Sequence, residues 1–447
     1  MSDAVVSATE HTLENQRLGG LQLRVIVICT LVQMCDGYDV GSIGWAVPSL
    51  THVWHIAPRA FAMAFLWSNV GVLVGALLAG PIGDRFGRKP LLLVSITIFG
   101  IASLASAFSQ SLEFLAATRF FTGLGIAGGF AGTTALTGDY APARLRATMI
   151  MVTFTGAPLG GFVGGLAVSY LLHLGYSWPM IFIIGGVFPL VLVLVMALWL
   201  PESPRFLAAK ANLAPHHRAL LQRLGIAHTA GQPHAVDLAA GNPIKLLFSE
   251  GYALRTVLLW IIFFCSLMNL FLFVFWLPEI LHLTGLTPAE AVFATSLYNL
   301  GAIAAVLYLG YLIDRFGAQR ALATNFAVGL VFILLLALAA MPYLLLLLVI
   351  FLAGAAVLGS QTGSNAACGA LYPARMRTSG IGWALGIGRL GGIAAAPLGG
   401  WLLSHGLAPR HVFLSACVFA VIATVATALL GLGARRIAPA RLTEVAQ

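Results

Sequence analysis

The sequence predicts an all-α, polytopic membrane protein with twelve transmembrane helices in two pseudo-symmetric six-helix halves. Composition is the first observation: 60% of the 447 residues are hydrophobic and only 9% are charged, which is too little charge for a soluble surface. The second is a series of apolar runs of about 20 residues, the length that crosses a bilayer at 1.5 Å per residue. The third is a set of short motifs that recur about 230 residues apart.

Hydropathy and charge place the helices in order and orient them. We expect spans at residues 22–50, 59–80, 90–109, 112–137, 146–172, 178–200, 255–282, 289–312, 319–340, 342–367, 378–404 and 409–433. With the amino terminus in the cytoplasm, most of the 24 lysines and arginines fall in the tails and cytoplasmic loops. This positive-inside pattern predicts a membrane protein with both termini cytoplasmic. The net charge of +9 is then an orientation signal, and no nucleic-acid partner is expected.

No motif indicates a metal, a cofactor or a cleaved leader. The amino-terminal tail is polar and acidic, unlike a signal peptide. The five cysteines all lie in predicted spans without metal or redox spacing. Residues 123–128 and 386–391 spell G-x-G-x-x-G, but a dinucleotide site needs a preceding strand, so we interpret both patterns as helix packing. There is no Walker loop, so energy is expected to come from a gradient.

The chain reads as an internal duplication. GDRFGRK at 83–89 recurs as IDRFGAQ at 313–319, and YAPARLRAT at 140–148 recurs as LYPARMRTS at 371–379. Each motif occupies the same place in its half, as expected for a transporter built from repeats.

The duplication predicts five segments. They are a cytoplasmic tail at 1–21, a first half at 22–200, a cytoplasmic linker at 201–254, a second half at 255–433 and a cytoplasmic tail at 434–447. The linker is too polar to span, and short interfacial helices are expected around SPRFLAAKANLAPHHRALLQRLG.

These motifs resemble those of the major facilitator superfamily, in the GPIGDRFGRKP loop, its degenerate copy DRFGAQR and the PESPRFL segment. The stretches DGYD, RFFTGLGIAGG and GWALGIGRLGG are similar to those of its aromatic acid:proton symporter family. The resemblance implies a secondary transporter of the bacterial cytoplasmic (inner) membrane that works by alternating access, and not an enzyme.

Four ionisable side chains are expected deep in the bilayer, away from the ends of the predicted spans: Asp36, Asp39, Arg119 and Arg389. Such groups are costly in a bilayer and usually serve a function. Asp36 and Asp39 share one helix face, and with Arg119 they are the expected proton-coupling group. Two acids and two arginines are neutral together, so a carboxylate substrate needs one proton to keep the loaded site neutral. Simple pairing of the four charges to hold helices together is the alternative.

Arg389 is the expected anchor of a substrate carboxylate, because a guanidinium binds a carboxylate bidentately; Arg119 competes for this role. Asn269 corresponds to Asp39 in the repeat and is the expected polar contribution of the second half. Aromatic rings could hold a planar substrate, although interfacial belts and packing use many of them. The aromatic candidates are Tyr38, Trp45, Phe273, Trp276, Tyr298 and Trp383.

The loop motifs are expected to act in gating, or, alternatively, only to set topology. The candidates are Gly83, Asp84, Arg85, Gly87, Arg88, Lys89, Asp139, Arg144, Asp314 and Arg315. In the superfamily this loop is thought to hold the cytoplasmic side closed. The second copy has Ala318 and Gln319 in place of two cations, which makes its latch doubtful.

The sequence therefore predicts a monomeric, proton-coupled importer of aromatic carboxylates such as hydroxybenzoates or benzoate, with protons, its substrate and the lipid bilayer as partners. The alternatives are a facilitator for a sugar or an aliphatic organic acid such as muconate, and, from another class, a membrane enzyme or receptor. Ring substituents, proton stoichiometry, and the choice of titrating aspartate stay open.

Overall fold

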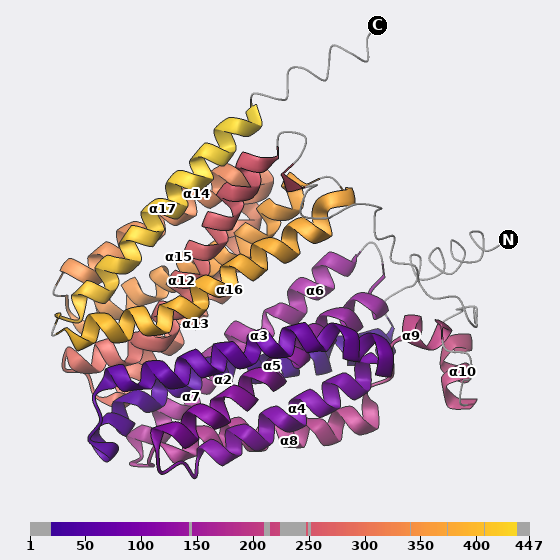
Figure 1. The fold of residues 1–447 in the computed structure, drawn as a ribbon, viewed down its shortest axis with the longest axis horizontal. Helices are drawn as coiled ribbons and strands as arrows, with labels where there is room; N and C mark the ends of the chain where they lie inside the picture. The colour runs from indigo at the N-terminus through magenta and orange to yellow at the C-terminus, as the bar shows by residue number, and fades with distance from the viewer. Residues whose placement is uncertain are drawn as a thin grey trace, which may run out of the picture. The chain divides into compact units, whose positions relative to one another are not determined.

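The computed structural model describes residues 19–142, 145–209, 215–223, 247–248, 252–339, 341–372, 374–405 and 407–435, and this part of the chain is helical without strands (Figure 1). The helices are α2 (Gly20–Trp54), η1 (Pro58–Phe61), α3 (Ala62–Phe86), α4 (Arg88–Ser106), α5 (Leu112–Tyr140), α6 (Arg146–Phe154), α7 (Gly156–His173), α8 (Pro179–Trp199), α9 (Pro204–Ala209), α10 (Pro215–Arg223), α12 (Ala253–Leu283), α13 (Pro288–Phe316), α14 (Ala318–Leu338), α15 (Tyr343–Leu371), α16 (Ala374–Ser404) and α17 (Arg410–Arg435).

The expected fold class is confirmed. Within the described residues, twelve helical segments are long and apolar enough to cross a membrane, at the places the hydropathy indicated. Several helices run past the predicted limits, as α2 does by reaching Trp54, because a helix continues through polar residues where the apolar run has ended. The fifth span differs in form: a break at Thr155 divides it into α6 and α7. The predicted linker contains two short helices, α9 and α10.

Packing divides the chain into two compact units. Unit 1 comprises 1–42, 67–161 and 177–236, and unit 2 comprises 43–66, 162–176 and 237–447. Helices α2, α3 and α7 each contribute residues to both units. This division is not the one expected from the duplication, whose two halves stay a prediction.

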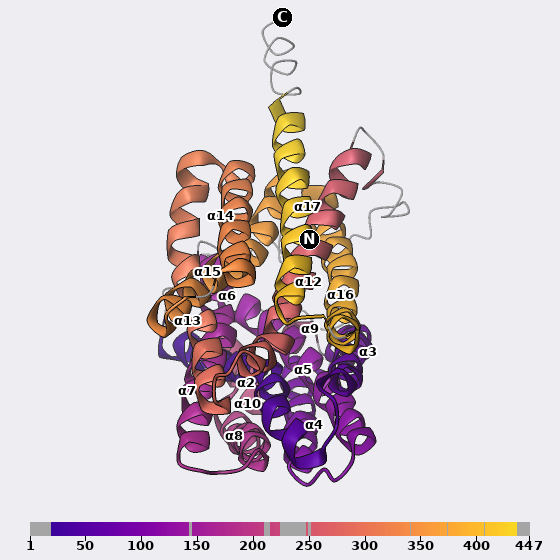
Figure 2. The ribbon, with the colours of Figure 1, turned by 90° about the vertical axis from the view of Figure 1, so that its left-hand side faces the viewer.

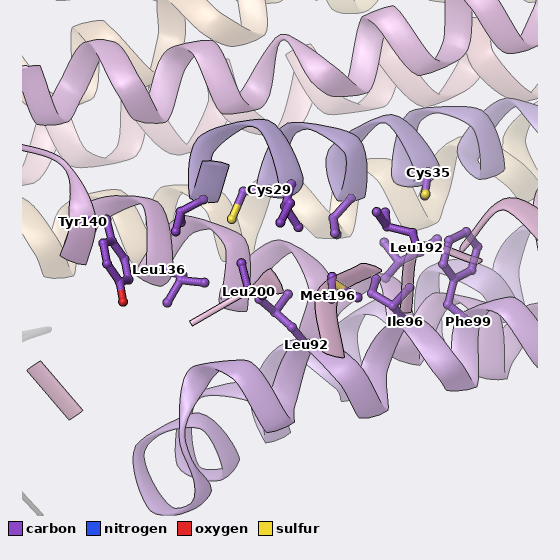
Figure 3. Packing of buried hydrophobic residues seen from close by; sticks show 14 of the residues in the cluster. Cys29, Cys35, Leu92, Ile96, Phe99, Leu136, Tyr140, Leu192, Met196 and Leu200 are labelled. Atoms are coloured by element: carbon purple, nitrogen blue, oxygen red, sulfur yellow. The ribbon is translucent and has the colours of Figure 1, made fainter. Parts of the chain in front are cut away.

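Unit 1 is built on one apolar core. Cys29 and Cys35 of α2 pack with Leu92 of α4 and Leu136 of α5 among its buried members (Figure 3). The core continues to α8 and reaches the short helices α9 and α10. The cysteines are buried and free, in keeping with a packing role.

Unit 2 has a core of its own. It joins Leu259 and Phe263 of α12 to Leu322 of α14, Cys368 of α15 and Ala423 of α17. Helix α17 lies alongside α14 and α12 (Figure 2), and α12 also packs closely on α16. Residues 43–66, which include the end of α2, also belong to this unit. Gly44 packs so closely on α12 that a Cβ atom on it would lie 2.8 Å from the Val274 carbonyl oxygen.

Candidate functional site

A buried ion pair lies at the centre of the site in unit 1. Arg119 of α5 donates from Nη1 to Asp39 Oδ1 of α2 at 2.8 Å, and the two side chains are only 1% and 2% exposed. Arg119 Nη2 donates to Ser106 Oγ at 2.9 Å, and the guanidinium lies 5.0 Å from the centre of the Phe182 ring. Ser42 Oγ makes a longer contact with Arg119 at 3.4 Å. The pair is thus held by α2, α4, α5 and α8 together.

Glycines let each helix of the pair approach another neighbouring helix closely. A Cβ atom on Gly125 of α5 would lie 2.5 Å from the Ser95 carbonyl oxygen of α4. On Gly37 of α2 it would lie 1.7 Å from the Ala157 carbonyl oxygen of α7. The packing interpretation of 123–128 is therefore confirmed. The pattern at 386–391 is mixed, because Gly391 lies against Phe264 whereas nothing stands within 4 Å of a Cβ on Gly386.

Asp36 lies one turn before Asp39 but in other surroundings. It is partly exposed and lines a small recess of unit 1, which we call the Asp36 recess, with Gln33, Phe99 and Phe130. Gln33 is itself fixed by donating to Thr133 Oγ1 at 2.9 Å. The structure therefore separates the two aspartates, which the sequence treated as one pair: Asp39 faces the arginine and Asp36 faces the recess.

Unit 2 contains a second recess, lined by Ser266 and Asn269 of α12 together with Ser360 of α15. Ser266 Oγ and Asn269 Oδ1 are buried, and neither has a hydrogen-bond partner among the described residues. The two recesses occupy equivalent places in the repeat, because five lining positions of the first recur in the second after 230 residues. These are Asp36 and Ser266, Ile96 and Phe326, Phe99 and Gly329, Ile126 and Ala356, and Phe130 and Ser360.

Among the predicted substrate-binding residues, the two on α16, Arg389 and Trp383, are accessible. Arg389 is partly exposed, and Trp383 is 41% exposed with its ring 6.1 Å from that of Trp260.

The other expected aromatics are buried. Tyr38 is committed to packing in unit 1, since its hydroxyl donates to the Ile181 carbonyl oxygen at 2.6 Å. In unit 2, Phe273 stacks on Tyr298 with ring centres 5.5 Å apart. Trp45 and Trp276 have no exposed surface.

A second polar cluster joins the start of α4 to the segment after α8. Glu202 Oε1 accepts from the backbone nitrogens of Arg88 at 2.9 Å, Lys89 at 3.2 Å and Ser203 at 2.7 Å. This carboxylate therefore caps the amino-terminal end of α4, where a helix has free N–H groups and favours negative charge. We call these four residues, with Gly87, the Glu202 cluster.

Gly87 makes this cap possible. Its φ is +108°, in the region that favours glycine, and a Cβ atom there would lie 2.3 Å from Glu202 Oε2. Gly317, its equivalent in the second repeat, has a φ of +84° but nothing within 4 Å of a Cβ. Whether the second copy acts as a latch stays a prediction from the sequence.

The remaining gating candidates lie in several environments. Asp84 pairs with Arg88 at 2.6 Å, and Asp139 accepts from Ser203 Oγ at 2.6 Å and pairs with Arg205 at 3.4 Å. Arg315 donates to the Tyr311 hydroxyl at 2.7 Å. Gly83 faces the side chains of Leu91 and Arg88, and the Arg85 guanidinium lies over the Phe86 ring. Arg144 is outside the described residues, as is the side chain of Asp314.

Sequence reasoning missed Glu202, Ser203 and Glu279. Glu202 and Ser203 were seen only as part of the PESPRFL motif. Glu279 of α12 is a buried carboxyl, 1% exposed, and its Oε2 atom has no hydrogen-bond partner among the described residues. The signal for it was present in FWLPEILHL, where an acid stands between apolar residues inside a predicted span.

Comparison with known proteins decides the family. The family model described as Major Facilitator Superfamily matches residues 29–283 and 259–445. The chain belongs to the Major Facilitator Superfamily. Its helical architecture is also that of solved members: the structure of a D-xylose–proton symporter superposes with a TM-score of 0.70 at 17% identity, covering 91% of this chain and 97% of the other. At this identity the likeness concerns the fold alone.

Within the superfamily, this transporter groups with aromatic acid transporters, as its motifs predicted. It is 35% identical to a gallate transporter of Pseudomonas putida over 88% of each chain. It is 32% identical to the 4-hydroxybenzoate transporter PcaK of the same species, over 94% of this chain and 95% of the relative. A benzoate transport protein of Acinetobacter baylyi is 30% identical, with 94% and 91% covered. The protein is therefore a multi-pass membrane transporter and not an enzyme.

Proposed function

We propose that this protein is a proton-coupled symporter that imports aromatic carboxylates, such as hydroxybenzoates or benzoate, by alternating access. It would work as a monomer in a bacterial cytoplasmic membrane, with both termini in the cytoplasm. The buried pair of Asp39 and Arg119, at 2.8 Å, is the observation that carries the proposal. The relatives named for gallate, 4-hydroxybenzoate and benzoate support the substrate class.

The pair supplies a way to couple a proton to an anion. Arg119 is almost fully buried, and an uncompensated charge in such a place is costly. A proton on Asp39 removes its negative charge, and the carboxylate of the substrate restores the net charge of the site as a whole. Proton uptake therefore favours anion binding, and anion binding favours proton uptake to the same extent.

Asp36 is the second group that can take part. It lies on the same helix as Asp39 but is partly exposed and lines its own recess. It can therefore exchange a proton without first breaking the buried pair. In our proposal Asp36, Asp39 and Arg119 form the proton-coupling group, in which either aspartate carries the transported proton.

Arg389 is the proposed anchor of the substrate carboxylate. Its partial exposure leaves it more accessible than Arg119, and its guanidinium can bind both carboxylate oxygens. Trp383, on the same helix and 41% exposed, is the aromatic residue best placed to meet a ring in this state. The buried candidates would line the substrate path only in states of the transporter that uncover them; these are Trp45, Asn269, Phe273, Trp276 and Tyr298.

The Glu202 cluster is the proposed cytoplasmic gate element. It fixes the end of α4 through two backbone hydrogen bonds to the Glu202 carboxylate, which also accepts from the Ser203 nitrogen, and Asp139 and Arg205 extend the network through Ser203. Charged contacts at a helix end can be made in one state and broken in another. Arg144 and Asp314 remain gating predictions from the sequence.

Uptake by proteoliposomes under an inward proton gradient tests the proposal. Labelled benzoate, 4-hydroxybenzoate, protocatechuate, muconate and glucose are supplied to the wild type and to Asp36→Asn and Asp39→Asn. Empty liposomes are subtracted, because benzoic acid crosses bilayers as the neutral acid. We expect uptake of an aromatic acid that requires the gradient and collapses in at least one variant.

Two outcomes would overturn the proposal in different ways. Uptake of glucose or muconate alone would identify a transporter of another substrate class. Aromatic uptake unchanged in both variants would remove the coupling role of the aspartates.

An imposed membrane potential then measures the proton stoichiometry. Uptake of a monoanion with one proton moves no net charge and does not depend on voltage, whereas a second proton adds a driving force of about 2.3 kcal/mol per 100 mV.

A further inference from the structure

Two histidines that hold equivalent places in the repeat contact each other in unit 2. His52, in the last turn of α2, and His282, in the last turn of α12, are 230 residues apart, and their Nε2 atoms lie 3.0 Å from each other. The rings meet edge to face, with centres 5.3 Å apart. His52 is exposed and His282 is partly exposed, so the contact lies at the surface of unit 2.

The surroundings of His282 fix which of its nitrogens is free to bind. Its Nδ1 atom lies 2.8 Å from the Leu286 carbonyl oxygen, which only accepts hydrogen bonds. Nδ1 of a neutral His282 must therefore carry the proton, and Nε2 must present a lone pair to His52. A ring N–H held by a backbone carbonyl is the usual way in which a metal-binding histidine is oriented.

We propose that the Nε2 atoms of His52 and His282 form a binding site for a divalent transition metal ion such as Zn²⁺, Ni²⁺ or Cu²⁺. Metal–nitrogen bonds are about 2.0–2.1 Å long. Two nitrogens at that length are about 2.9 Å apart at a right angle and about 3.3 Å apart at the tetrahedral angle. The observed separation of 3.0 Å falls between these values, so it fits one ion shared by both nitrogens once the His52 proton sits on Nδ1 and the two lone pairs turn toward the ion.

The remaining coordination positions belong to water. No group of three or more His, Cys, Asp or Glu residues suited to a metal occurs in the described part of the chain. The pair alone thus favours ions that accept imidazole ligands, and affinity follows the order in which Cu²⁺ exceeds Ni²⁺ and Zn²⁺. Both rings must be neutral to bind, so acid weakens the site.

Metal binding would tie the last turn of α2 to the last turn of α12. This consequence rests on the proposed function: in alternating access these two helix ends belong to different repeats and separate when that side opens. A metal on the site would therefore hold this side closed and slow transport, while leaving the fold intact.

Copper binding to the purified full-length protein tests the site without reference to transport. The protein carries no polyhistidine tag, and His216→Ala and His217→Ala are present throughout, because these adjacent linker histidines could bind metal themselves. Electron paramagnetic resonance should show two equatorial nitrogens in the parent. It should show one in His52→Ala and one in His282→Ala, with affinity lowered at least about tenfold by loss of one of two linked ligands.

His405→Ala is the matched control. His405 is an exposed histidine just after α16 whose Nδ1 lies 3.0 Å from the Trp401 carbonyl oxygen, so it resembles His282 in its anchoring. We expect its removal to leave the two-nitrogen spectrum unchanged. A parent spectrum with a single nitrogen, or two nitrogens that persist in both His52→Ala and His282→Ala, would overturn the site.

Transport is then measured with the same proteins. Zn²⁺ on the side of His52 and His282 should slow aromatic acid uptake, a chelator should restore it, and both alanine variants should be insensitive. Copper binding without inhibition would keep the site and reject its gating consequence. Absence of any substrate uptake would count against the proposed function, and the copper spectra would still decide the site.

Discussion

Asp36 and Ser266 stand at the same position of the two repeats, 230 residues apart, and each lines a small recess in its own unit. The recesses share their framework but differ in chemistry, because one holds a carboxyl and the other a hydroxyl. The two repeats thus use equivalent positions to line a recess, and among these positions only the first repeat has an acid. Proton chemistry is therefore expected on the Asp36 side.

This difference gives a first prediction. Asp36→Asn should lower proton-driven uptake at least tenfold, equivalent to about 1.4 kcal/mol, because the side chain can no longer take up a proton. Substrate exchange across the membrane should persist, since exchange needs no net proton transfer. Uptake and counterflow are measured in the same proteoliposomes.

Ser266→Ala is the control at the equivalent position. Ser266 Oγ has no hydrogen-bond partner among the described residues, so its removal costs little and uptake should stay within about twofold of the wild type. An equal loss in both variants would show that the recesses matter through packing alone.

The buried pair of Asp39 and Arg119 gives a second prediction, on stability. Arg119→Gln and Asp39→Asn should each lower the free energy of unfolding by about 3–5 kcal/mol, because each leaves one buried charge unpaired. The double variant should regain most of this loss, since it buries no net charge. Unfolding in mixed micelles measures all three.

Transport separates the two roles of this pair. The double variant should fold well and still fail to accumulate substrate against a gradient, because it has lost Asp39 and Arg119 of the proton-coupling group even though Asp36 remains. Accumulation by the double variant would mean that the pair only holds helices together.

A third prediction concerns Gly87. Gly87→Ala should lower the free energy of unfolding by about 2 kcal/mol or more, because the residue has a φ of +108° and its Cβ would lie 2.3 Å from Glu202 Oε2. Strain from such a backbone conformation alone is about 1–3 kcal/mol. The unfolding midpoint and the rate of uptake are the two readings.

Gly317→Ala is the control for the strain that comes from the positive φ alone. Gly317 also has a positive φ, +84°, but a Cβ there would meet nothing within 4 Å. Its replacement should therefore cost only the conformational strain and should slow uptake less. If both variants behave alike, the contact with Glu202 adds nothing to the strain.

The fourth prediction concerns Glu202, whose single oxygen Oε1 accepts three backbone hydrogen bonds. Glu202→Ala should destabilise the protein by about 1–3 kcal/mol, the cost of leaving buried donors unsatisfied. Glu202→Gln keeps an accepting oxygen and should recover part of that loss. Amide hydrogen exchange at Arg88 and Lys89 reports the cap directly, and unchanged protection in Glu202→Ala would contradict it.

The number of spans and the ionisable residues within them could be predicted from the sequence, because both depend on composition along a short stretch. Asp36, Asp39, Arg119 and Arg389 were found in this way, whereas Glu279 was missed although the same pattern contained it. Tyr38 shows what the sequence could not predict. It was expected to contact the substrate, but in the structure its hydroxyl donates a hydrogen bond to the Ile181 carbonyl oxygen.

Sequence alone determined the twelve helices, the family and the presence of two aspartates one turn apart. The tertiary structure decided that Asp39 pairs with Arg119 while Asp36 lines a recess. It also decided that Glu202 caps a helix that begins 114 residues earlier, and that His52 meets His282. Residues three apart differ by about 60° around a helix, so the rotation and crossing of the helices choose each partner, and those depend on contacts between distant parts of the chain.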